Sequence, residues 1–96
     1  MIVAITNNKD VELGHLDITN TNWIADPTSG FINAEDIMIP VGKHGTATKV
    51  IFRTNGGFIF TKGNCSEVKV TPGMAYHFKS RCLRVAFPSD AKKEMQ

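Results

Sequence analysis

Few residues in this chain have the types and spacing that catalysis or metal binding requires. The three histidines, His15, His44 and His77, are scattered along the sequence, and none belongs to a metal-binding motif. Glu35 and Asp36 are the one adjacent pair of carboxylates, but neighbouring residues of a strand point to opposite faces. We therefore expect solvated or hydrogen-bonded side chains at these positions, with no catalytic residue and no metal.

Two further groups resemble a zinc site and a phosphate-binding loop but lack the other residues that these sites need. Cys65 and Cys82 are the only cysteines, without the C-x-x-C spacing of a zinc site, so we expect reduced thiols. One disulfide is the alternative if neighbouring strands bring the pair into range. Residues 41–46 include Gly42-Lys43, as in a phosphate-binding loop, but lack its leading glycine and its following helix. The sequence predicts neither an enzyme nor a cofactor.

Gly57-Phe58-Ile59-Phe60 is the segment that most closely matches a known binding signature. Alternating aromatic residues on a strand form the core of RNA-recognition and cold-shock signatures, in which the rings stack on bases. Asn55-Gly56 replaces the upstream glycine–aromatic pair of those signatures, and glycines of a turn also explain the match. A platform for single-stranded nucleic acid is therefore the alternative function.

The composition indicates one small domain without a dominant charge. Ninety-six residues bury roughly 60–65% of the unfolded surface, so the core is thin and self-association would add stability. The 11 Lys and Arg residues against 9 Asp and Glu give a net charge of +2, which does not favour nucleic acid. The sequence has no apolar run near the ~20 residues of a membrane span and no signal-peptide pattern at its start. We expect a soluble protein made in the cytoplasm.

The elements that must position these residues are short strands. Four apolar runs between residues 46 and 87 are divided by the turn signals Asn55-Gly56-Gly57, Lys62-Gly63-Asn64 and Pro72-Gly73. No segment repeats with the helical period of 3.6 residues. The sequence predicts an all-β fold, a small antiparallel β-sandwich or open barrel, over residues 1–88. Residues 89–96 form a polar tail, in which Ser89 could begin one short helical turn.

Local patterns predict further details of the strands. Val11 and Leu13 are at odd positions and Leu16 and Ile18 at even positions, so the apolar residues change from one face of the strand to the other. We therefore expect a β-bulge or bend at Gly14-His15. Pro40 suits an edge strand. We expect residues 20–30 to form a long loop pinned by Trp23.

The last two strands are expected to form a hairpin and an edge. A three-residue loop at Pro72-Gly73-Met74 would pair Val70 with Tyr76 and Val68 with Phe78. The final strand would cover residues 82–87 and point Leu83, Val85 and Phe87 inward.

The hairpin at Asn55-Gly56 decides which side chains share a face. A two-residue Asn-Gly loop favours a type I′ turn, which would place Arg53 opposite Phe58. A loop at Gly56-Gly57 would shift the pairing by two residues and leave the faces unchanged. One face carries Val50, Phe52, Ile59 and Thr61. The other, the predicted interaction face, carries Lys49, Ile51, Arg53, Phe58, Phe60 and Lys62.

Both faces of this hairpin contain large apolar residues, whereas a single core needs only one. The second face must therefore be covered by a loop, for example the one that contains Trp23, or by another chain.

Three stretches of the chain resemble the short all-β accessory structural proteins of tailed bacteriophages. These are Ile2-Val3-Ala4-Ile5-Thr6-Asn7-Asn8, then Val11-Glu12-Leu13-Gly14, and later Thr46-Ala47-Thr48-Lys49-Val50. The resemblance implies a virion role, such as head decoration or a head–tail or tail component, usually as a symmetric oligomer. It transfers no functional residue.

The sequence thus leads to a non-enzymatic interaction module, expected to be a homo-oligomer docked on a larger assembly. Its interface would bury Ile51, Phe58 and Phe60, with Lys49, Arg53 and Lys62 at the rim. Nucleic-acid binding by the same face is the alternative. A small protein inhibitor of a host enzyme is a further one. The protein would occur in the cytoplasm when synthesised, and the resemblance to phage proteins implies the virion as its later location.

Overall fold

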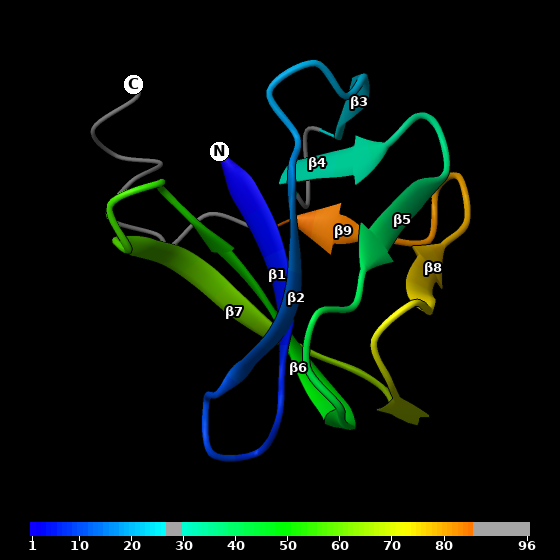
Figure 1. Cartoon of the computed structure of the whole chain (residues 1–96). Helices are drawn as coiled ribbons and strands as arrows, with labels where there is room; N and C mark the ends of the chain where they lie inside the picture. Colours follow the sequence, from blue (N-terminus) through cyan, green and yellow to red (C-terminus); the bar gives the residue numbers. More distant parts are fainter. Residues whose placement is uncertain (27–29, 86–96) are drawn as a thin grey trace.

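The chain folds into β-strands, as a computed structural model of residues 1–26 and 30–85 shows (Figure 1). The described residues contain no helix, which confirms the all-β prediction. The strands are β1 (Ile2–Thr6), β2 (Glu12–Asp17), β3 (Trp23–Asp26), β4 (Gly30–Asn33), β5 (Ile37–Pro40), β6 (Gly45–Arg53), β7 (Ile59–Val70), β8 (Ala75–Phe78) and β9 (Arg84–Val85).

The largest sheet is antiparallel and has the order β2-β1-β6-β7. Strand β1 lies inside it, and all five of its residues are buried. Val3 opposes Phe52 and Ile5 opposes Val50, and these four side chains belong to the main core. Because alternate residues of a strand point to opposite faces, Ile2, Ala4 and Thr6 lie on the outer face of this sheet.

A β-bulge in β2 joins this sheet to its neighbour. Ile5 opposes Gly14 and Thr6 opposes Glu12, so Leu13 is the extra residue. The predicted irregularity is confirmed, one residue before Gly14-His15. The carbonyl oxygen of Leu13 accepts hydrogen bonds from the amides of Gly42, at 2.9 Å, and Lys43, at 3.1 Å. These bonds hold the end of β5 against β2.

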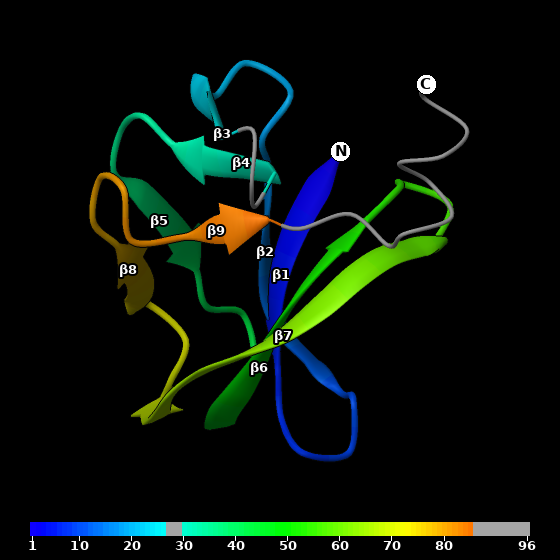
Figure 2. The same cartoon turned by 180° about the vertical axis from the view of Figure 1, so that it is seen from behind.

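Strands β5 and β8 form a second antiparallel pair, which continues the wall of the fold. An isolated bridge between Gly14 and Val41 links β2 to the end of β5. On the other side of the pair, the Tyr76 hydroxyl donates to the carbonyl of Ser66 in β7, at 2.8 Å. The strands therefore follow one another around the core as β7-β6-β1-β2-β5-β8, which makes an open barrel (Figures 1 and 2). Pro40 lies on an edge strand of its sheet, as predicted.

The third sheet, β3-β4-β9, packs over one end of this barrel. The Trp23 ring makes an edge contact with Phe52, with ring centroids 6.2 Å apart. Buried Asn33 donates to the carbonyls of Glu35 and Lys79 and accepts from the amide of Leu83. The prediction of a loop over residues 20–30 was wrong, because residues 23–26 pair with β4 despite their polar surroundings in the sequence. The indole does anchor the segment, but to the core face of the main sheet.

The expected hairpin between β7 and β8 was also wrong. Val70 opposes Gly45 in β6, whereas Tyr76 opposes Ile39 and Phe78 opposes Ile37 in β5. Val68, expected to pair with Phe78, opposes Ala47 in β6 and is 40% exposed. A local pattern of apolar residues shows that two strands have matching faces, but it does not show that they are neighbours.

Strand β7 is continuous through Lys62-Gly63-Asn64, where the sequence suggested a turn. Gly63 opposes Val50 and Asn64 opposes Lys49, so the backbone hydrogen bonds of β6 hold this segment extended. Further along, one residue of β6, Thr48, lies opposite residues 65–67 of β7. This irregularity bends β7 toward β8.

The final strand begins two residues later than expected, at Arg84. Strand β9 has two residues and pairs with β4. Leu83 is buried, as predicted, and Arg84 is exposed. Phe87, the end of the domain at residue 88, the tail 89–96 and its helical turn lie outside the described residues.

Candidate interaction surface

The hairpin between β6 and β7 forms neither of the two predicted two-residue loops, because the Thr54 amide donates to the Phe58 carbonyl around a three-residue loop, 55–57. Beyond a bulge, Ile51 opposes Lys62 and Phe52 opposes Thr61, the pairs that a loop at Gly56-Gly57 would have given. Arg53 then opposes Ile59, so the Arg53–Phe58 pairing was wrong and Phe60 is the extra residue. Ile59, expected to face the core with Phe52, is 41% exposed.

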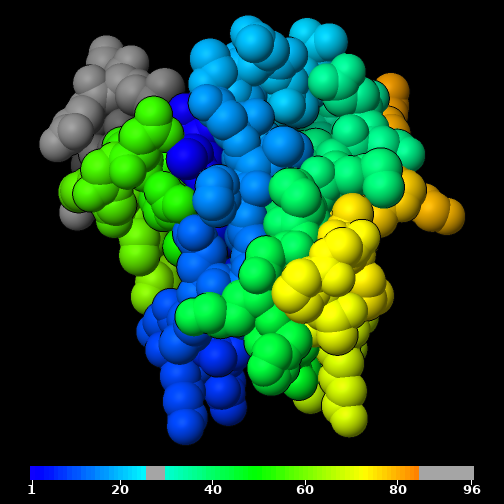
Figure 3. All heavy atoms as spheres, viewed as in Figure 1, coloured from blue at the N-terminus to red at the C-terminus, as the bar shows by residue number. Residues whose placement is uncertain are grey.

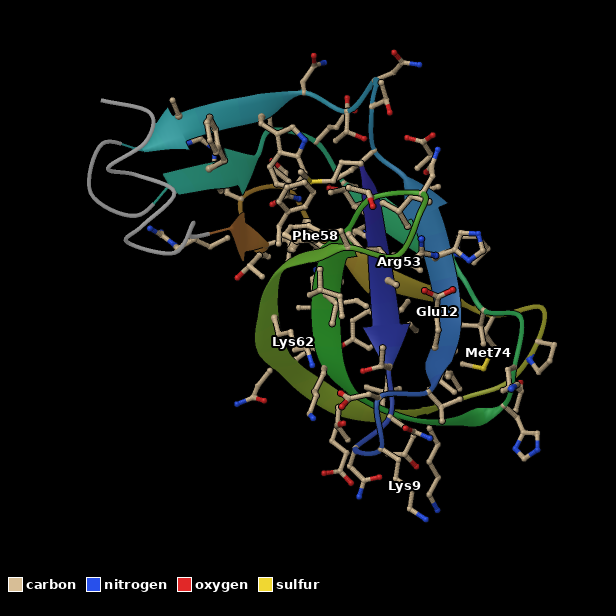
Figure 4. All side chains as sticks on the ribbon, turned by 90° about the vertical axis from the view of Figure 1, so that its left-hand side faces the viewer. Lys9, Glu12, Arg53, Phe58, Lys62 and Met74 are labelled. Carbon is tan, nitrogen blue, oxygen red and sulfur yellow. The ribbon has the colours of Figure 1, made fainter. Side chains whose placement is uncertain are left out.

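An ion pair covers the outer face of the main sheet. The Arg53 guanidinium binds the Glu12 carboxylate in a fork, with Nε–Oε1 at 2.9 Å and Nη2–Oε2 at 3.2 Å. Since β1 lies between β2 and β6, this pair crosses above Ala4. Figure 4 shows the Glu12 carboxylate directed toward Arg53. The Arg53 side chain is only 15% exposed, so its aliphatic part covers apolar surface beneath it.

A second charged group continues this cover. Asp10 Oδ1 lies 3.2 Å from Lys49 Nζ and 3.8 Å from Lys62 Nζ. The hydrogen bond from Lys49, followed by the positive charges of both lysines, lowers the pKa of Asp10. His15 Nδ1 lies 3.2 Å from Glu12 Oε2. The acids in this layer were missed by sequence analysis, because they lie about 40 residues from Lys49 and Arg53 and meet them only through the strand order.

The structure divides the predicted interaction face in two. Ile51 is 7% exposed, and Lys49, Arg53 and Lys62 are engaged with acids of the same chain. Phe58, in contrast, is 67% exposed.

We call the three residues Phe58, Ile59 and Phe60 the aromatic tip. The rings of Phe58 and Phe60 meet edge to face, with centroids 5.3 Å apart and an interplanar angle of 78°. Phe60 is half-buried, so it supports Phe58 from below. The turn that presents the tip is held by hydrogen bonds from the Phe58 amide to Thr54 Oγ1 and from the Thr54 amide to the Phe58 carbonyl. Gly57 has φ of 98°, a conformation that favours glycine.

A second surface, lined by both apolar and polar residues, lies at the other end of β7. It is a groove of about 260 Å³ lined by Ser66, Val68, Val70, Met74, Ala75, Tyr76 and His77, and we call it the β7–β8 groove. Val70 and Tyr76 are buried, whereas Met74 is 46% exposed. Figure 3 shows residues near 55 and residues near 74 on opposite sides of the molecule. Figure 4 shows Phe58 and Met74 on different sides of the Arg53–Glu12 pair.

Asp36 and Tyr76 make polar contacts within the chain. Asp36 accepts a hydrogen bond from the Ser80 amide at 2.7 Å and contacts His77 Nε2 at 2.9 Å, and these bonds lower the pKa of Asp36. Burial raises the pKa of Tyr76, as does its contact with Cys65. Cys65 and Cys82 are both free thiols. Within residues 1–26 and 30–85, no group of three or more His, Cys, Asp or Glu residues is placed to hold a metal ion.

Comparison with protein-family models, with curated proteins and with solved structures gives no match. In the described part of the chain, no helix has the length and apolar character that crossing a membrane requires.

Proposed function

We propose that this chain is a non-enzymatic interaction module that self-associates and docks on a larger assembly. The observation that supports this function is the aromatic tip, in which the adjacent residues Phe58 and Ile59 are exposed next to half-buried Phe60. Folded monomers rarely leave such residues contiguous and uncovered, whereas exposed aromatic residues are enriched in protein interfaces.

Burial of the tip would supply a substantial share of a binding free energy. A phenylalanine side chain buries about 200 Å², so the 67% exposure of Phe58 leaves ~130 Å², worth ~3 kcal/mol if covered. The ion pairs beside it are already made within the chain, so association does not have to desolvate unpaired charges.

The resemblance to accessory structural proteins of tailed bacteriophages supports a place on a virion. Head decoration, a head–tail position and a tail position are all consistent with a small all-β chain that presents an apolar tip. Such a protein would be made in the cytoplasm and then join the particle.

Sedimentation velocity over a concentration series up to high micromolar tests self-association. We expect the 10.6 kDa chain to form oligomers, and Phe58→Asp to raise the concentration needed at least tenfold, because a carboxylate cannot be buried unpaired. Val11→Asp is the matched control, since Val11 is an exposed apolar residue outside the tip. A wild-type chain that stays monomeric throughout, with no effect of Phe58→Asp, would contradict the proposal.

Binding of single-stranded nucleic acid is the second candidate, because the exposed Phe58 ring could stack on a base. The pairing of Lys49, Lys62 and Arg53 with acids weakens this function, since these cations would have to exchange partners. It predicts oligonucleotide binding that decreases with salt and with Phe58→Ala. Absence of a gel shift at low salt would remove it.

A further inference from the structure

The aromatic tip and the β7–β8 groove have opposite shapes. The aromatic tip ends in a Phe58 side chain that is 67% exposed, next to the turn of a hairpin. The β7–β8 groove is concave, with buried Val70 and Tyr76 among its lining residues. Its volume of about 260 Å³ lies below the range of roughly 300–1,000 Å³ typical of small-molecule pockets. Its size suits a single inserted side chain better than a complete ligand.

The two surfaces cannot meet within one molecule. Strand β7 begins at Ile59 in the tip and ends at Val70 in the groove, and its 12 residues span up to ~40 Å. The longest dimension of the molecule is 41 Å. The hairpin projects on one side of the barrel, and the β7–β8 turn lies on the other (Figures 1 and 3).

The chemistry of the groove matches an aromatic side chain. Met74 is a flexible thioether at the rim, and sulfur makes favourable contacts with aromatic rings. The Tyr76 hydroxyl already donates to the Ser66 carbonyl, so an apolar group that enters would not leave it unpaired.

Building on the self-association proposed above, we infer that copies of this chain associate head to tail. The aromatic tip of one copy enters the β7–β8 groove of the next copy. The interface is heterologous, so its repetition gives a closed ring or an open chain of subunits. A contact between two tips would leave both grooves exposed, whereas the head-to-tail contact covers the aromatic tip and the β7–β8 groove together.

A mixing experiment distinguishes these arrangements. Phe58→Asp removes the tip but keeps the groove, and Met74→Asp damages the groove but keeps the tip. We expect each variant alone to associate at least tenfold more weakly than wild type. An equimolar mixture should form a dimer and nothing larger, because only one functional tip and one functional groove can meet. Sedimentation velocity at matched total concentration measures the species present.

Controls separate loss of folding from loss of contact. Both substituted residues are exposed, so circular dichroism and thermal unfolding should match those of wild type. Val11→Asp should associate like wild type in the same experiment.

The possible results differ in what they overturn. If Met74→Asp associates normally, or if the mixture stays monomeric, the head-to-tail arrangement is wrong and self-association through the tip still stands. If wild type itself is monomeric at every concentration, the proposed function fails together with the inference.

Discussion

Arg53 and Glu12 explain how a sheet that is apolar on both faces can be covered without a second core. Arg53 was predicted at the rim of an interface, yet its guanidinium reaches across β1 to Glu12. Ala4 and Ile51, which oppose each other in the sheet, are both buried. The long aliphatic parts of charged residues therefore exclude water from them, while the charges stay near the surface.

This cover predicts a stability effect for Arg53→Ala. The substitution exposes Ile51 and leaves Glu12 without its main cation, so we expect the free energy of unfolding to decrease by ~1–2 kcal/mol. Chemical denaturation at neutral pH measures it. Lys43→Ala, at an exposed lysine, is the control and should change stability by less than ~0.5 kcal/mol. A similar small change for Arg53→Ala would show that the ion pair does not cover Ile51.

The bulge in β2 joins two sheets into one barrel wall. Leu13 turns its carbonyl to the amides of Gly42 and Lys43, and the next residue, Gly14, bridges to Val41. A side chain at Gly14 would collide with the carbonyl oxygen of Pro40. Glycine is therefore required here by the close approach of two backbones.

Gly14→Ala should consequently separate β2 from β5. We expect a loss of ~2–3 kcal/mol, because the obstacle is backbone and cannot rotate away. Gly42→Ala provides the matched control, since a methyl group at Gly42 meets no atom within 4 Å. Thermal unfolding of the two variants tests this explanation, which fails if both shift the midpoint equally.

Three exposed aspartates make bonds that favour their charged form. Asp10 contacts β6 and β7, Asp17 binds Thr19, and Asp36 connects the start of β5 with residues 77–80. Hydrogen bonds from Lys49, from the Thr19 hydroxyl and from the Ser80 amide, respectively, lower the pKa of these three carboxyls. The ionised forms thus stabilise the fold.

This linkage predicts that stability decreases in acid. A carboxyl whose pKa is lower in the folded chain stabilises it above the unfolded pKa of ~3.9, and this stabilisation is lost as pH falls through the folded value. We expect the melting temperature to be level between about pH 7 and 5 and to fall below about pH 4. Asp36→Asn should melt lower at neutral pH and show a shallower acid decrease. An unchanged melting temperature at pH 3 would contradict the role of these bonds.

Much of the architecture could be predicted from local patterns. Local patterns identified the strand that leads into the Asn55-Gly56 hairpin and the edge strand with Pro40, and the parity change between Leu13 and Leu16 located the bulge to within one residue. These features depend on neighbours in the sequence, where side-chain periodicity reports directly on the backbone. The failures were of another kind. The predicted β7–β8 hairpin and the turn at Lys62-Gly63-Asn64 both assumed that consecutive strands pair with each other.

For the candidate site, the amino-acid sequence established that an aromatic segment follows a glycine turn and that the hairpin has two apolar faces. Tertiary packing settled which of those residues remain exposed. Glu12 and Arg53 are 41 positions apart in the sequence, but their strands lie on the two sides of β1. Their side chains therefore meet above β1, and this contact covers Ile51. A bulge at Phe60 aligns Ile59 with Arg53, and Phe58 is left at the surface. Periodicity predicts which side chains of a strand share a face. Which other segments cover that face depends on pairing between distant parts of the chain.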